Sequence, residues 1–183
     1  MSVKRILVMV ISSIYGAYAL EAATTLDIGT SNNVSGSGIA SIGNANAGDA
    51  NNSVIVGQYH YADAIDSSLS VGNSNFLIES DGVVAVGSIN AVTGNDSITS
   101  GYQNINAGFR SLVLGRYNIA SQEFYSDAVV FGRYGDFISK AAFLVVGNGI
   151  SGSVRQNAFV VYQDGDVIVT KRQGDVSMGI YGN

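Results

Sequence analysis

One short phrase, Gly-x-x-Asn, recurs with variations along the sequence at spacings of 14 to 17 residues, and it limits what the chain can fold into. The aligned glycines are Gly29, Gly43, Gly57, Gly72, Gly87, Gly101, Gly115, Gly132 and Gly147. Asparagine follows three positions later in six copies, as Asn32, Asn46, Asn75, Asn90, Asn104 and Asn118. Such a period is typical of a solenoid, in which each repeat forms one coil and contacts only its neighbours.

The residues before each glycine predict a short strand. An apolar side chain stands three positions and one position before the glycine in almost every copy, as in Val54 and Val56 before Gly57; Ser100 is the exception. Because side chains alternate along a strand, we expect these two positions to point into the fold. The position between them would then point outward, and it carries a branched apolar residue in four copies: Ile55, Val113, Val130 and Val145.

Fourteen residues leave room for two strands of about four or five residues and two turns, but not for a helix. We therefore predict an all-β fold, a parallel β-roll of about nine coils of 14 to 15 residues. Gly and Asn tolerate the left-handed backbone of tight turns and would form the corners. Equivalent asparagines would lie about 4.8 Å apart and form a hydrogen-bonded ladder. The extra residues of the seventh copy, 121–128, should bulge outward and expose Phe124 or Tyr125.

The N-terminal segment, residues 1–19, predicts an export signal. Two basic residues precede an apolar run over 6–15, and small residues follow up to a cleavage site after Ala19, with Ala22 or Ala23 as alternatives. The apolar run is shorter than the roughly 20 residues that cross a bilayer. We expect the processed chain to be exported, with no integral membrane segment.

The last part of the sequence, residues 148–183, follows a different pattern. Apolar and polar side chains alternate around Asp-Gly at 164–165 and around Gly-Asp at 174–175, which predicts two hairpins. An open solenoid end exposes unpaired strand edges. We therefore expect 148–183 to cap the roll formed by 20–147 and to act as its trimerisation module.

Composition and charge exclude several kinds of site and partner. The sequence has no Cys, so neither a disulfide nor a thiolate metal site is available. Residues 20–109 hold eight acidic side chains and no Lys or Arg, in a chain of net charge −5. This negative field opposes phosphate-rich partners, and we expect no nucleic-acid binding.

Few side chains offer chemistry. His60 is the only histidine, and a lone histidine does not make a catalytic set. Asp66, Asp81 and Asp96 each stand nine residues after their glycine, and Arg110 takes that place in the next coil. We interpret this column as solvated acids beside an arginine, with structural calcium or lyase chemistry as alternatives. We expect no enzyme activity and no cofactor.

Aromatic side chains supply the candidate contact surface. Tyr59 and Tyr61 flank His60, and we assign these three residues to it. Three more tyrosines occupy neighbouring coil positions: Tyr102, Tyr117 and Tyr134. Such a strip would either pack at subunit seams and shield a thin core, or contact sugars or proteins.

The repeats resemble a known family. Phrases such as SIGNANAGDANNSVIVG and LVLGRYN, within residues 25–147, are similar to the head-domain repeats of YadA-type trimeric autotransporter adhesins. The tail, from Val146-Gly147-Asn148-Gly149 onward, is similar to a module of bacterial surface fibres and phage tail fibres. The resemblance implies a left-handed parallel β-roll and a homotrimer at the surface of a bacterium. It also implies a structural or adhesin-like function, with a host, matrix or glycan ligand; a metal-dependent or sugar-binding protein on the same scaffold is the alternative.

Overall fold

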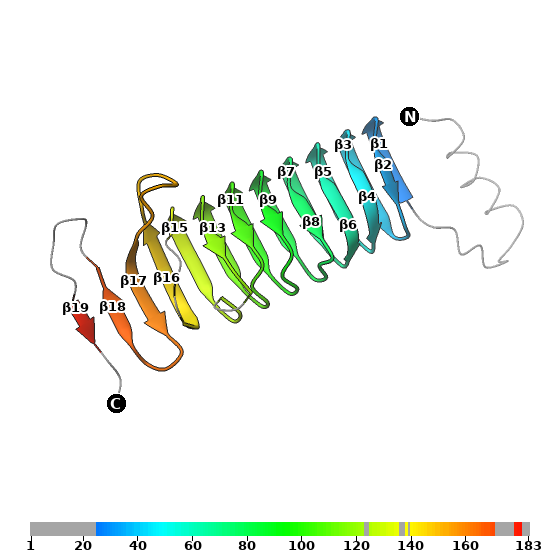
Figure 1. Ribbon diagram of the computed structural model, residues 1–183. Helices are drawn as coiled ribbons and strands as arrows, with labels where there is room; N and C mark the ends of the chain where they lie inside the picture. Colours follow the sequence, from blue (N-terminus) through cyan, green and yellow to red (C-terminus); the bar gives the residue numbers. More distant parts are fainter. Residues whose placement is uncertain (1–24, 123–124, 136–137, 139, 171–177, 181–183) are drawn as a thin grey trace, which may run out of the picture.

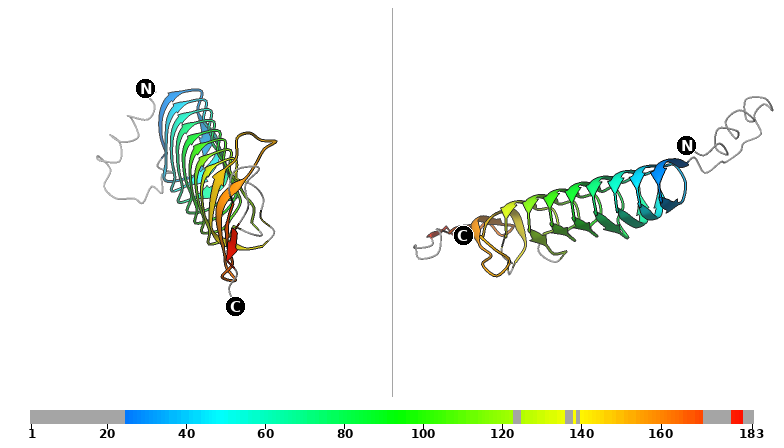
Figure 2. Two further views of the ribbon diagram at one scale, coloured as in Figure 1. Left: turned by 90° about the vertical axis from the view of Figure 1, so that its left-hand side faces the viewer. Right: turned by 90° about the horizontal axis from the view of Figure 1, so that it is seen from above.

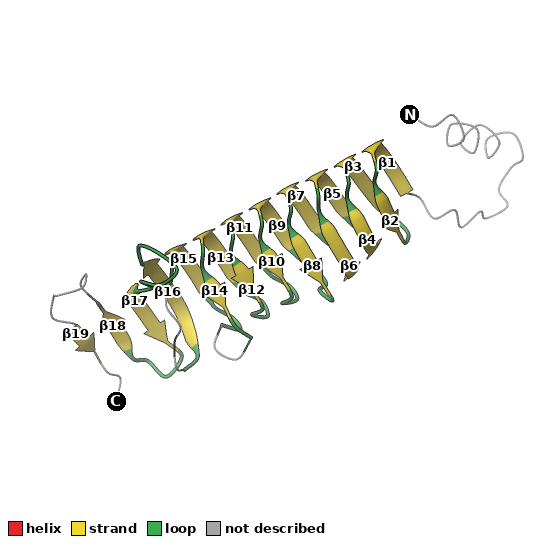
Figure 3. Cartoon of the chain, turned by 45° about the horizontal axis from the view of Figure 1, so that its top comes forward, coloured by secondary structure: helices red, strands yellow, loops and turns green. Residues whose placement is uncertain are grey.

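The computed structural model describes residues 25–122, 125–135, 138, 140–170 and 178–180. Several expectations fall outside these residues: the export signal at 1–19, the placement of Phe124, and the Gly-Asp turn at 174–175. Every regular element in the described part of the chain is a strand (Figure 3). No helix in it is therefore long and apolar enough to cross a membrane.

The chain winds as a flattened roll with one strand of each sheet in most coils (Figures 1 and 2). The long sheet contains nine parallel strands: β1 (Thr25–Thr30), β3 (Ile39–Asn44), β5 (Val54–Gln58), β7 (Leu69–Asn73), β9 (Val84–Ser88), β11 (Ile98–Tyr102), β13 (Leu112–Arg116), β15 (Val129–Arg133) and β16 (Ala142–Asn148). The short sheet contains seven: β2 (Asn33–Ser35), β4 (Ala47–Asn51), β6 (Tyr61–Asp66), β8 (Phe76–Ile78), β10 (Ala91–Val92), β12 (Ile105–Asn106) and β14 (Ile119–Ala120).

The strand register confirms the period that the sequence predicts. The repeat glycines pair with one another in an unbroken line across the long sheet, from Gly29 with Gly43 to Gly132 with Gly147. Nine parallel strands are joined by eight turns of the chain, so the fold is an all-β parallel solenoid of about eight turns. The eighth turn, between β15 and β16, has no strand in the short sheet among its described residues.

The two faces of the long sheet are the reverse of the sequence prediction. Ile55 is fully buried, whereas Val54, one position earlier, is 40% exposed. The inward position is therefore the middle one of each strand, and its buried occupants are Ser41, Ile55, Ser70, Ala85, Thr99, Val113, Val130 and Val145. Each strand contributes only one side chain to the interior at these three positions. That side chain is Ser, Ala or Thr in some coils and Ile or Val in others.

The interior has two apolar clusters with a polar layer between them. The first is formed by Ile39, Ala50, Ile55, Ala62, Ile65, Leu77, Val83, Ala85 and Val92. The second is formed by Val113, Ala120, Tyr125, Ala128, Val130, Ile138, Ala142, Val145, Val160 and Tyr162. Between them the Asn106 amide donates to Thr99 Oγ1 at 2.9 Å, and the Ser111 hydroxyl donates to Asn106 Oδ1 at 2.7 Å. These bonds satisfy polar groups that burial would otherwise leave without a partner.

Residues after Ala120 close the C-terminal end of the roll. Tyr125 is buried in the second cluster, so the expectation that it would be exposed on an outward loop is wrong: a ring of this size fills space where the coil widens. Beyond β16 the chain turns back antiparallel as β17 (Asn157–Tyr162), β18 (Val167–Val169) and β19 (Met178–Ile180). The β17–β18 pair places Asp164 and Gly165 in the tight turn predicted for them.

Candidate functional site

The corner that follows each strand of the long sheet, which we call the glycine corner, requires glycine for two reasons. Eight of the nine repeat glycines have φ between 108° and 138°. The backbones of adjacent coils also approach closely, so that a Cβ built on Gly101 would lie 1.8 Å from the carbonyl oxygen of Gly115. Two residues after the glycine, non-glycine residues also take positive φ, including Tyr59 at 56° and the β-branched Ile89 at 59°.

The asparagines of the glycine corner form a buried ladder, but mainly through the backbone. The amide N–H of Asn118 donates to Asn104 Oδ1, and that of Asn104 donates to Asn90 Oδ1, both at 3.1 Å. Each side-chain NH₂ donates to backbone carbonyls, as Asn104 does to Gly115 O at 2.8 Å. Direct side-chain to side-chain bonds, at 3.1 Å, link Asn90 to Asn75 and Asn104 to Asn90. The ladder thus ties each corner to the next one.

His60 takes the place of asparagine in the third coil. Its Nε2 lies 3.2 Å from Val56 O and 3.1 Å from Gly72 O, the carbonyls that an asparagine amide would reach at this position. Nε2 therefore carries the proton, and Nδ1 accepts from the Ser70 hydroxyl at 2.9 Å. Burial lowers the pKa of His60, which favours this neutral ring.

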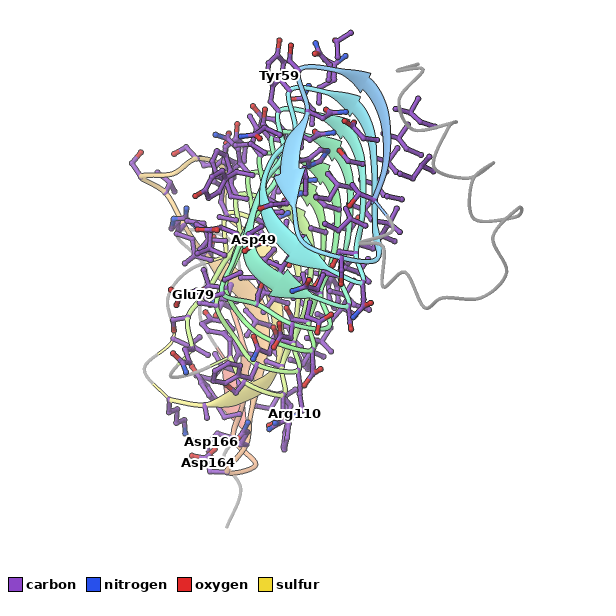
Figure 4. The ribbon with its side chains drawn as sticks, turned by 90° about the vertical axis from the view of Figure 1, so that its right-hand side faces the viewer. Asp49, Tyr59, Glu79, Arg110, Asp164 and Asp166 are labelled. Carbon is purple, nitrogen blue, oxygen red and sulfur yellow. The ribbon has the colours of Figure 1, made fainter. Side chains whose placement is uncertain are left out.

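We expected Tyr59, His60 and Tyr61 to form a contact surface, and this expectation is wrong for His60. His60 is 1% exposed and points into the roll. Tyr59 is exposed at the glycine corner (Figure 4), and Tyr61 is exposed on the outer side of the short sheet, beside Phe76 at a ring-centre distance of 6.3 Å. The two tyrosines therefore belong to separate surfaces, because the chain turns inward between them.

The outer side of the long sheet is a continuous apolar surface, which the sequence prediction had placed inside. We define the outer apolar face by these residues: Leu26, Ile28, Ala40, Ile42, Val54, Val56, Leu69, Val71, Val84, Val86, Ile98, Leu112, Leu114, Val129, Phe131, Leu144 and Val146. None of them is buried in the single chain. They form two parallel columns that run across all nine parallel strands.

The proposed column of Asp66, Asp81, Asp96 and Arg110 is split in two. Asp66 pairs with Asp81, but Asp96 lies one position further on, where its N–H donates to Asp81 O at 2.8 Å. The coils that begin at Gly57 and Gly72 have one residue more than the 14-residue coil that holds Asp96. In the first of them this extra residue appears as a register shift between β4 and β6. Arg110, at the corner opposite Tyr59 (Figure 4), makes a two-pronged ion pair with Asp127 at 2.6 and 2.9 Å.

These acids have ordinary local partners. Hydrogen bonds from Asn52 and Ser67 lower the pKa of Asp66, and the hydrogen bond from Arg110 lowers the pKa of Asp127. Both side chains of the Arg110–Asp127 pair are exposed, so this ion pair contributes little to stability. Within the described residues no three His, Cys, Asp or Glu side chains come close enough together to hold a metal ion.

Three of the five tyrosines expected to form a strip do lie together at the glycine corner. Tyr117 and Tyr134 stack with ring centres 4.4 Å apart and planes 5° apart. Tyr102 meets Tyr117 edge-on, at 5.4 Å and 81°. Burial, followed by the neighbouring Tyr134 and Tyr102, raises the pKa of the Tyr117 hydroxyl. The sequence signal for this group is the change of the corner phrase to GYQN, GRYN and GRYG in three successive copies.

Comparison with known proteins adds no further assignment: no family model matches the chain, and no curated protein or solved structure matches it significantly. The β-solenoid itself agrees with the repeat fold that the resemblance implies.

Proposed function

We propose that the chain is an exported, non-enzymatic structural or adhesin-like module that assembles as a homotrimer through the outer apolar face. The observation that carries this proposal is the face itself, with two columns of apolar side chains and no buried member in the single chain. Eight strand spacings of about 4.8 Å give it a length of about 38 Å. Monomeric soluble proteins rarely leave so long an apolar strip in water.

The repeat makes a second copy of the chain the best partner for this face. Its columns have the spacing of the strands, so the same face of another copy presents side chains at the same interval along its whole length. Burying aliphatic side chains stabilises such contacts by about 25 cal/mol per Å². Three copies is the number implied by the resemblance to YadA-type head repeats. The surfaces left outside the assembly would then serve attachment or fibre formation.

Two isoleucines with matched exposure test the interface. Ile98 lies on the outer apolar face and is 45% exposed, whereas Ile105 lies on the outer side of the short sheet and is 47% exposed. We expect Ile98→Lys to weaken or abolish the trimer, because three lysines would meet inside it, and Ile105→Lys to leave the trimer intact. Sedimentation at several protein concentrations measures both. Equal effects of the two substitutions would contradict the assigned face.

A further inference from the structure

Three successive glycine corners, at Gly101, Gly115 and Gly132, differ from the earlier ones. The earlier phrases are GTSN, GNAN, GQYH, GNSN and GSIN, and none of them contains an arginine. The later phrases are GYQN, GRYN and GRYG, which bring in three tyrosines and two arginines. We call the resulting group the tyrosine–arginine cluster: Tyr102, Arg116, Tyr117, Arg133 and Tyr134. Tyr102 is in register with Arg116, and Arg116 with Arg133. The three residues therefore form one column at the C-terminal ends of β11, β13 and β15.

The two arginines of the cluster differ from the other described basic residues, because each of the others has a partner. Arg110 pairs with Asp127, and Lys140 pairs with two aspartates of the β17–β18 turn. Arg155 donates to the carbonyl oxygens of Tyr117 and Gly135 at 2.8 and 2.9 Å.

The side chains of Arg116 and Arg133 form no ion pair or hydrogen bond with any residue that the structure describes. They occupy directly paired positions on adjacent strands, where like charges repel each other. Both side chains are exposed. An anion held between the two guanidinium groups would remove this repulsion and receive charge-assisted hydrogen bonds.

The tyrosines add hydroxyl groups and an apolar surface to this charge. Tyr117 and Tyr134 hold each other by stacking, and Tyr102 packs edge-on against Tyr117 while remaining 41% exposed. A phenol hydroxyl can donate to a sulfate or carboxylate oxygen, and an exposed ring can pack against a sugar.

We propose that the tyrosine–arginine cluster binds the sulfate or carboxylate groups of an acidic glycan. A nucleic acid fits less well, because Tyr117 and Tyr134 stack on each other and leave no gap for a base. The proposal names a ligand class for the attachment function proposed above and rests on that function, although the cluster itself is complete within one chain.

Binding is tested on the full processed protein with fluorescent hexasaccharides. Heparin-derived hexasaccharide carries sulfate and carboxylate, hyaluronan hexasaccharide carries carboxylate alone, and chitohexaose is neutral. We expect binding to heparin, hyaluronan or both, weakening as salt rises, and none to chitohexaose. The double substitution Arg116→Gln with Arg133→Gln should weaken binding at least about tenfold. Arg110→Gln, at the opposite corner, is the matched control and should leave it unchanged.

The remaining outcomes separate this site from the proposed assembly. Binding that is unchanged in the double variant, or equally tight binding of a single-stranded hexanucleotide, overturns the glycan site. Loss of the trimer in the double variant also overturns it, because the arginines would then be contacts between copies. A monomeric wild-type protein that binds heparin through the two arginines would contradict the assembly and support the site.

Discussion

At the scale of single residues, each corner depends on a backbone that few side chains accept. The repeat glycines have positive φ, and a Cβ at their positions would overlap the backbone of the adjacent coil. The asparagine ladder then fixes the distance between corners through bonds to the backbone. The sequence predicted which residues turn the corner from their local conformational preferences. It did not predict that the ladder would run through the backbone amides, because that depends on the exact orientation of each side chain.

Gly101→Ala should destabilise the protein severely. The new Cβ would overlap the carbonyl oxygen of Gly115, and φ at this position is 124°, so both the space and the conformation are wrong for alanine. We expect a loss of at least about 3 kcal/mol in the free energy of unfolding, measured by chemical denaturation. Gly152→Ala is the control, since nothing lies within 4 Å of its added Cβ. Comparable losses in the two variants would contradict the close-approach argument.

His60 should make stability fall at acidic pH. Its pKa is lowered in the folded state by burial, so below a pH of about 6.5 the unfolded chain takes up a proton that the folded chain does not. This contribution is fully present above that pH and is lost as the pH falls toward the folded-state pKa. His60→Asn restores the usual residue of the column and removes the titration.

The difference in unfolding free energy between wild type and His60→Asn should therefore change between pH 7.5 and pH 5, with wild type losing more. Carboxylates titrate in both proteins and cancel in this comparison. A difference that stays constant with pH would show that His60 is not buried as a neutral ring.

At the scale of single strands, alternation predicted two faces but not which of them lies inside. A globular strand usually buries its apolar side, so the consistently apolar positions predict the core. In this narrow roll the inner column is mixed, with Ser70 and Thr99 beside Val113, whereas the outer columns are apolar at every position except Ser100. The most consistently apolar positions therefore lie on the outer surface of the sheet. The reason is that the interior is thin, so that small side chains can occupy it.

Coils with one extra residue limit how well positions in different coils can be aligned from the sequence. Counting from the glycine aligned Asp66 and Asp81 with Asp96, but the extra residue of a 15-residue coil is accommodated before the opposite corner. Ala64 and Glu79 take positive φ there, at 52° and 49°. Sequence spacing alone could not decide where along the coil the extra residue would be accommodated.

Removing the tail should disrupt the end of the roll. Val160 and Tyr162 of β17 pack into the second apolar cluster, and β17 pairs with the last parallel strand, β16. We expect deletion of residues 149–183 to expose this cluster and an unpaired strand edge, and so to give aggregated or misassembled protein. Gel filtration and dye binding to exposed apolar surface report the change. A truncated protein that keeps the melting temperature and size of the intact chain would contradict the capping role.

At the scale of the whole molecule, the roll is long, thin and different on each side. Strands contact mainly their neighbours along the stack, so the interior of a single roll holds few large side chains. Most of the large aliphatic residues of the long sheet face outward instead. The fold class followed from the period of the sequence, because the period fixes one coil. The outward placement of the apolar columns did not follow from it, and the proposed assembly rests on that placement.

Sedimentation equilibrium of the processed protein at micromolar concentration tests this central claim most directly. Burial of the outer apolar face between copies predicts a species of three times the mass of one chain, stable to dilution and weakened by Ile98→Lys. A folded protein that sediments as a monomer, with the outer apolar face in water, would contradict the account.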